Sequence, residues 1–338
     1  MSTTSTTLDG PRRLSRVLRF HETGEPLDVL CEERIEVPEP PRGQIRVRVL
    51  ATGLNPADWE LCRGFMPGSL PRGVGCDVAG VVDAVGEGVD AAAAQVGDVV
   101  FGTADFIGQA SAGAAEVAIV TVWSPVPDGL DPVHAATLPM VVQTAAWTLE
   151  VLGLASGATL LVHGAGTMVG YAAVQIALRR GARVIATAGH TFAEELASFG
   201  AGVTGYGPGM VDRVRTLTGG QDVDLVLDAP RPSPGTLPDL ISLAGGDARR
   251  VMTISNHDEA RSLGARVNID ELRPGLSPLT GLLAEHAALA ARGEFRLPIA
   301  RAYPFDEWRE AVELSLSGYP HGKIVLLPAS PDLQEASA

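Results

Sequence analysis

The stretch Leu160-Leu-Val-His-Gly164-Ala-Gly166-Thr-Met168-Val-Gly170 runs from an apolar segment through a glycine-rich turn into an alanine-rich segment. Between a strand and a helix, such a turn lets backbone N–H groups and the helix N-terminus hold a pyrophosphate. Met168 stands where a glycine would ordinarily permit close approach of the phosphates. A packing turn between strand and helix is therefore the alternative interpretation.

Regular alternation of strand and helix patterns surrounds this turn. Strands are expected at 159–163, 183–187, 203–206, 223–228 and 250–255, and helices at 169–180, 191–199, 209–217 and 235–244. This order predicts a doubly wound parallel sheet with right-handed crossovers. The first 140 residues instead carry short apolar runs bounded by turn residues, which favours mostly β structure. A helix at 305–317 and a strand at 323–327 follow near the end.

The end of the second expected strand bears on the choice of cofactor. It reads Ala186-Thr-Ala188-Gly189-His190 and lacks the acid that would accept from a ribose 2′-hydroxyl and repel a 2′-phosphate. NADP(H) is therefore permitted. No Arg or Lys follows directly, so His190, Thr191 and Tyr206 are the candidate donors to that phosphate, and the preference for it is expected to be modest.

Length, charge and cysteine content narrow the classes of protein further. The 338 residues exceed the roughly 150 of one typical domain, so two domains are expected. Lys and Arg number 26 against 40 Asp and Glu, a net charge of −14 that disfavours nucleic acid and anionic membranes as partners. The three cysteines form no CxxC pair, which favours a reducing, cytoplasmic location.

One uncharged run, residues 151–178, is long enough to raise the question of a membrane span. Its glycines and His163 argue for a buried strand, turn and helix, because a turn inside a bilayer would leave backbone groups unpaired. Residues 1–14 contain no apolar stretch, so we expect a flexible tail rather than a secretory signal.

Several motifs occur in an order that resembles one known superfamily. They are Gly53-Leu-Asn55-Pro-Ala-Asp58, Gly75-Cys-Asp77-Val-Ala-Gly80, Val96-Gly-Asp98-Val-Val-Phe-Gly102, Leu138-Pro139 with Thr144-Ala145, the glycine-rich turn, Val223-Asp-Leu-Val-Leu-Asp228 and Gly322-Lys323-Ile-Val-Leu. Together they resemble the medium-chain dehydrogenase/reductase superfamily, in its zinc-independent quinone oxidoreductase-like and enoyl reductase-like branch.

The resemblance implies an α/β protein of two domains. A GroES-like, β-rich catalytic domain would comprise residues 15–138 and 299–338, and a Rossmann domain, residues 139–298, would bind NADPH. The active-site cleft would lie where they meet. The cofactor-binding residues implied are Gly164, Gly166, Thr167, Met168, Val169, Gly170, Ala188, Gly189, His190, Tyr206, Ile254, Ser255, Asn256 and Lys323.

No metal is expected. The positions that hold zinc ligands in related alcohol dehydrogenases look like Asn55 and Gly75-Cys76-Asp77 here, and a thiol with one carboxylate is not a three-ligand catalytic set. Cys76 is interpreted as a small buried residue. Without a Lewis acid the substrate must already be activated, as a quinone or an α,β-unsaturated carbonyl compound is.

The candidate catalytic residues by resemblance are Asn55, Asp58, Glu60 and Thr144. Asn55 and Thr144 would lie near the nicotinamide, whereas Asp58 is either catalytic or a structural partner. Glu60 and Met66 occupy positions where relatives carry tyrosines, so the phenolic proton donor is missing, and Glu60 is alternatively a solvated charge. Ala193 replaces a frequent lysine, which again leaves the 2′-phosphate with few donors.

Three functions stay open at this point. The first is a metal-free NADPH-dependent reductase of quinones or enones, with water or ribose relaying the proton. The second is a reductase dedicated to one secondary-metabolite intermediate, such as a polyketide enone. The third is a nucleotide-binding protein without catalysis, suggested by Met168 and the missing tyrosine. A homodimer is expected, with residues 294–298 as a possible edge strand.

Overall fold

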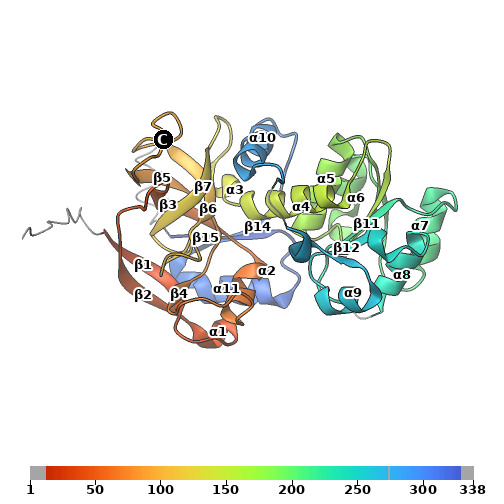
Figure 1. Ribbon diagram of the computed structural model, residues 1–338, viewed down its shortest axis with the longest axis horizontal. Coiled ribbons are helices and arrows are strands. Elements are labelled where there is room, and N and C mark those ends of the chain that lie inside the picture. The colour runs from red at the N-terminus through yellow and green to blue at the C-terminus, as the bar shows by residue number, and fades with distance from the viewer. Residues whose placement is uncertain (1–12, 234, 273–274, 329–338) are drawn as a thin grey trace, which may run out of the picture. The chain divides into compact units, whose positions relative to one another are not determined.

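The computed structural model describes residues 13–233, 235–272 and 275–328 and divides the chain into two compact units (Figure 1). One unit contains residues up to Met140 together with those from Arg301 onward, and the other is Val141–Ala300. Residues 1–12 of the expected tail lie outside the described residues. Arg13 and Leu14, which were also assigned to that tail, instead begin the first strand, β1 (Arg13–Phe20).

The second unit contains a six-stranded sheet in the order β10-β9-β8-β11-β12-β13, and every neighbouring pair is parallel. Counted along the chain, this is the order 3-2-1-4-5-6 of a Rossmann sheet. The strands are β8 (Thr159–His163), β9 (Arg183–Thr187), β10 (Gly202–Thr204), β11 (Leu225–Asp228), β12 (Val251–Thr253) and β13 (Arg266–Val267).

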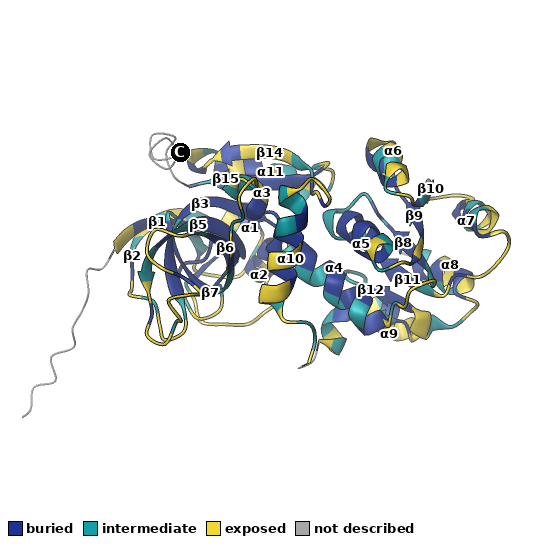
Figure 2. Cartoon of the chain, turned by 90° about the horizontal axis from the view of Figure 1, so that it is seen from above, coloured by how far each residue is buried: buried dark blue, intermediate teal, exposed yellow. Residues whose placement is uncertain are grey.

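Helices supply the crossovers and bury the sheet. They are α4 (Pro139–Leu152), α5 (Met168–Arg179), α6 (His190–Ser198), α7 (Met210–Thr218), α8 (Thr236–Leu243), α9 (His257–Leu263) and α10 (Leu279–Ala291). Leucine, valine and methionine side chains of α7 and α8 share one core cluster with strand residues such as Leu161 and Val226. Figure 2 shows the central strands as mostly buried and parts of the helix surfaces as exposed.

Some expected boundaries in this unit were wrong. The third strand ends at Thr204, so Tyr206 lies in the loop beyond it. The fifth ends at Thr253, which places Ile254 and Ser255 in a loop. Residues 294–298 form no strand, and the next strand, β14 (Ile299–Pro304), joins the sheet of the first unit. The edge-strand argument for a dimer therefore fails.

The first unit is built around a second six-stranded sheet, ordered β14-β15-β3-β5-β6-β7, in which β3 also pairs with β7. That extra pairing curls the sheet around an apolar core in which valine predominates. Its other strands are β3 (Ile45–Leu54), β5 (Asp77–Val85), β6 (Val99–Ala104), β7 (Val117–Pro125) and β15 (Lys323–Leu327).

A smaller layer completes this unit. Its sheet has the order β2-β1-β4, with β2 (Leu30–Val37) and β4 (Arg72–Gly73). The helices are α1 (Pro26–Val29), α2 (Pro56–Cys62), α3 (Pro132–Ala135) and α11 (Trp308–Ser317). Trp59 of α2 is buried and donates to Ser315 Oγ of α11 at 2.7 Å, so two helices that are far apart in the sequence contact each other here.

Among the helices of the described residues, none combines the length and the apolar character needed to cross a bilayer.

Candidate cofactor and active-site residues

Two glycines of the turn between β8 and α5 are required by the fold itself. Gly164 has φ +74°, and a Cβ there would lie 2.6 Å from Pro230 Cδ. A Cβ on Gly170 would lie 2.5 Å from the carbonyl oxygen of Gly164. These residues let the chain turn sharply and let α5 pack closely on the strand, two of the roles that glycines have in dinucleotide-binding turns.

Gly166 differs from both. Its φ is not in the left-handed region, and a Cβ there would meet only Phe192 Cδ2, at 3.8 Å. The fold therefore does not require a glycine at this position, and the space beside its backbone is open to a ligand. Thr167 caps α5 by accepting the N–H of Gly170 at 3.1 Å, and Met168 is the half-buried first residue of the helix.

A buried chain of hydrogen bonds connects this turn to the ends of β8 and β9. Thr187 Oγ1, at the end of β9, accepts the N–H of Gly164 at 3.1 Å and donates toward His163 Nδ1 at 2.8 Å. Burial lowers the pKa of His163 to about 4, so the imidazole is neutral at pH 7. A neutral imidazole can accept this proton, which ties the ends of two neighbouring strands to the turn.

A second buried chain holds the loop after β12. The Thr253 hydroxyl donates to Asp228 Oδ2 at 2.8 Å and accepts the N–H groups of Ser255 and Asn256 at 3.3 and 3.0 Å. Burial raises the pKa of Asp228 to about 6. The loop of Ile254, Ser255 and Asn256 is thus fixed by a carboxylate on the adjacent strand.

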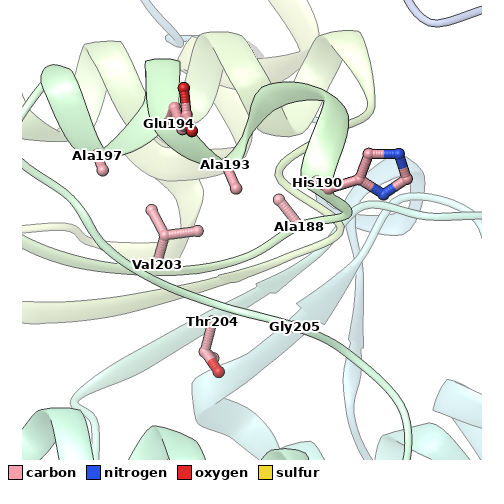
Figure 3. Close-up of a pocket in the computed structure, with 8 residues that line it drawn as sticks. All are labelled: Ala188, His190, Ala193, Glu194, Ala197, Val203, Thr204 and Gly205. Atoms are coloured by element: carbon pink, nitrogen blue, oxygen red, sulfur yellow. The ribbon is translucent and has the colours of Figure 1, made fainter.

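A pocket of about 490 Å³ lies beyond the end of β9 (Figure 3). It is lined by Ala188, His190, Ala193, Glu194, Ala197, Val203, Thr204 and Gly205. The structure therefore brings Ala188 and His190 together with Ala193, the position where a lysine is frequent. Glu194, which the sequence reasoning did not consider, brings an exposed carboxylate to the wall of this pocket.

Tyr206 and Gly189 also lie close together. A Cβ on Gly189 would be 3.7 Å from Tyr206 Oη, and the tyrosine is 58% exposed. Arg213 on α7 shapes this loop by donating to Thr204 Oγ1 and to the carbonyls of Gly205, Tyr206 and Pro208. Arg213 was missed from the sequence because it lies outside the turn motifs.

In the first unit, Asn55 lies in a buried polar cluster. Its Nδ2 donates to Asp77 Oδ2 at 2.9 Å, and its Oδ1 accepts from Lys323 Nζ at 2.7 Å. Lys323 Nζ also lies 3.6 Å from Asp77 Oδ2, and the N–H of Met140 donates to Asp77 Oδ1 at 2.9 Å. Lys323 was expected at the cofactor. The residue is 3% exposed and its ammonium is bound within this cluster, so its role at the cofactor stays a prediction.

Asp58 holds the start of α2 in place. Its Oδ2 accepts the N–H of Asn55 at 2.7 Å, and its Oδ1 accepts the backbone N–H groups of Gly75 and Cys76 at 3.1 and 3.2 Å. The Cys76 thiol donates to the same oxygen at 3.3 Å. These contacts make Asp58 a buried hydrogen-bond partner of Asn55 and Cys76, which favours the structural interpretation; a catalytic role stays a prediction.

If Asp58, Asp77 and Lys323 were all ionised, the cluster would carry a net negative charge. Burial raises the pKa of Asp58 and, to about 6, that of Asp77, and it lowers the pKa of Lys323. Burial also raises the pKa of the Cys76 thiol well above its ordinary value, so this cysteine is not an activated nucleophile. Two buried carboxylates share one ammonium, which favours keeping a proton within the cluster.

Two further predicted catalytic residues are Glu60 and Thr144. Glu60 is exposed and pairs with Arg63 Nη1 at 2.7 Å, as the solvated-charge interpretation expects. Thr144 is half-buried in α4 and belongs to the second unit. Among residues that sequence reasoning missed, Thr187 and Thr253 carried the clearest available signal, because each is a hydroxyl at the carboxyl end of an apolar strand.

Comparison with known proteins agrees with this architecture. Residues 41–127 match the family model of the alcohol dehydrogenase GroES-like domain, and residues 203–326 match that of the zinc-binding dehydrogenases. Quinone oxidoreductase from Rattus norvegicus is 31% identical over 225 residues, which are 64% of this chain and 67% of the rat protein. The chain belongs to the medium-chain dehydrogenase/reductase superfamily, in its quinone oxidoreductase-like branch. It is thus an oxidoreductase whose fold binds a nicotinamide cofactor.

Two further relatives of this medium-chain reductase extend the comparison. Erythronolide synthase EryA2 from Saccharopolyspora erythraea is 33% identical over 90% of this chain, but the chain spans only 8% of that protein's length. The solved structure of a mycobacterial quinone oxidoreductase superposes with a TM-score of 0.71 at 26% identity, covering 93% of this chain and 100% of the other.

Proposed function

We propose that this protein transfers hydride from NADPH to a quinone or an α,β-unsaturated carbonyl compound without a metal. The open space beside Gly166 and the acid-free end of β9 carry the proposal, because the first offers room for a pyrophosphate and the second lacks the acid that would accept from a ribose 2′-hydroxyl. Tyr206 and His190 supply hydrogen-bond donors at that end. Glu194 opposes a phosphate charge, so the preference over NADH is modest.

The chemistry of the first unit's cluster favours an activated acceptor. At the positions of the zinc ligands of related alcohol dehydrogenases, Asn55 and Asp77 bond to each other, and the Cys76 thiol is bound to Asp58. These groups do not present three free ligands for a Lewis acid. NADPH, when bound, supplies the hydride. Hydride addition to a quinone or enone needs only hydrogen-bond donors for the developing oxyanion and a proton from water or ribose.

A dedicated enone reductase of a secondary-metabolite pathway is the second candidate. The match to erythronolide synthase EryA2 along 90% of this chain favours it. The proposed chemistry is the same, and only the acceptor differs. A cytoplasmic location and a homodimer stay predictions.

Parallel fluorescence titrations with NADPH and NADH test the cofactor proposal. We expect binding of both, with NADPH modestly tighter. Gly166→Ala should weaken both by filling the space beside the turn, while the free energy of unfolding of the unliganded protein stays within about 1 kcal/mol of wild type, since the new Cβ would meet only Phe192 Cδ2, at 3.8 Å. Binding of neither cofactor would make the turn a packing turn and refute the proposal.

An acceptor assay tests the reaction. We expect NADPH oxidation with simple quinones or with enones, and a clear preference for a polyketide-type enone thioester would select the second candidate. A protein that binds NADPH but leaves it reduced with every acceptor would be a non-catalytic nucleotide-binding protein.

A further inference from the structure

Three potential metal ligands converge at one edge of the first unit, on the small sheet β2-β1-β4. β1 and β2 are antiparallel, with Arg19 opposite Cys31. Cys31 and Glu33 are two residues apart on β2 and therefore project from the same face. His21 follows the end of β1 and faces them, at the start of the connection that contains α1.

The distances between these side chains are short. His21 Nε2 lies 2.6 Å from Glu33 Oε1, and the Cys31 thiol lies 3.4 Å from the same oxygen. One ligand atom from each residue lies within 4.8 Å of the other two. Arg19 binds only the second carboxylate oxygen, Oε2, through Nε at 2.7 Å and Nη2 at 2.5 Å. The arginine thus orients Glu33 and leaves Oε1 directed at His21 and Cys31.

We propose that His21, Cys31 and Glu33 form a zinc site outside the catalytic machinery. Nitrogen, sulfur and oxygen donors are the ligands zinc takes in tetrahedral sites, with water in the fourth position. Bond lengths of about 2.0–2.3 Å place such ligand atoms about 3.3–3.8 Å from one another. The 2.6 Å separation of Nε2 and Oε1 must open by less than about 1 Å, and the exposed His21 can make that movement.

The charges also balance. Zinc binding releases the Cys31 proton to solvent, so one thiolate and one carboxylate neutralise the divalent ion, and Arg19 faces a neutral centre rather than a second cation. The side chains of His21 and Glu33 are 53% and 29% exposed, which gives an ion access from solvent. The expectation of no metal was based on Asn55 and the segment around Cys76. These residues do not belong to the proposed zinc site.

Zinc binding can be measured directly on the full chain. Competition with a chromophoric chelator should give one Zn²⁺ per chain, and Co²⁺ in its place should show a thiolate-to-cobalt charge-transfer band. Cys31→Ser should abolish that band, and Cys31→Ser and His21→Gln should each weaken binding by more than the roughly 10- to 100-fold typical of losing an outer partner. His134→Gln is the matched control, since His134 is an exposed histidine paired with Asp131.

Protection from alkylation provides a second readout that needs no variant. Cys31 is the half-buried cysteine, whereas Cys62 and Cys76 are buried. Zn²⁺ should slow modification of Cys31 by iodoacetamide, and peptide mass spectrometry identifies the site. Absence of stoichiometric binding, a cobalt spectrum without the thiolate band, or equal affinity in Cys31→Ser would overturn the proposal.

Discussion

Asp228→Asn offers a quantitative test of the buried chain that holds the loop after β12. The pKa of Asp228 is raised from its ordinary 3.8 to about 6 because the carboxyl is buried, although its hydrogen bond with Thr253 acts in the opposite direction. A group whose pKa is higher in the folded protein stabilises the fold below its unfolded pKa and loses that contribution as pH rises through the folded pKa. The difference between the folded and unfolded pKa values, at about 1.36 kcal/mol for each pH unit, corresponds to about 3 kcal/mol of unfolding free energy.

The variant removes this titration and keeps an oxygen that can accept from Thr253. From pH 5 to pH 8 we expect the wild type to lose about 1.4 kcal/mol of unfolding free energy relative to Asp228→Asn, measured by urea denaturation at several pH values. Asp224→Asn, an exposed aspartate on the same segment that accepts the N–H of Thr159, controls for loss of charge. A difference between wild type and Asp228→Asn that does not change with pH would refute the reasoning.

Three further substitutions test separate parts of the structure. Gly170→Ala should destabilise the fold by about 1–3 kcal/mol in urea, because its Cβ would lie 2.5 Å from the Gly164 carbonyl; an unchanged midpoint would contradict this. Lys323→Met should cost about 3–5 kcal/mol at pH 8 by leaving Asp77 without its buried cation, and a loss below 1 kcal/mol would show that Lys323 and Asp77 do not form an ion pair. Ala193→Lys should tighten NADPH about tenfold or more, and NADH much less, in the fluorescence titration; equal gains for both would place the 2′-phosphate elsewhere.

Much of the fold could be predicted from local patterns. Strands such as β8 and β9 are apolar runs next to glycine-rich turns, and their bounds agree with the expected ones. The ends of β10 and β12 were placed too late because Tyr206 and Ile254 favour strands locally, whereas the parallel pairing stops before them. Helices α4 and α10 were not expected, since both are rich in apolar and small residues and lack a continuous polar face to reveal their period.

Site residues could be predicted only where they belong to a recognisable sequence motif. Asn55 and the glycine-rich turn carry such signals. The contact of Lys323 with Asn55 was not expected, because it depends on β15 pairing with β3, a contact across 268 positions of sequence. The roles of Glu194 and Arg213 depend on how α6, α7 and β10 pack together, which no local pattern shows.

Burial of Lys323 also determines how this protein reacts with reagents and enzymes that modify lysine amines. It is the only lysine among 338 residues, so arginine guanidinium groups and the few histidines supply the other cationic side chains. Guanidinium groups keep their charge at every physiological pH and do not react with acylating agents as amines do. Side-chain acetylation, ubiquitination or ester-based cross-linking at lysine would therefore require the fold to open first, and reactivity at this position would report unfolding directly.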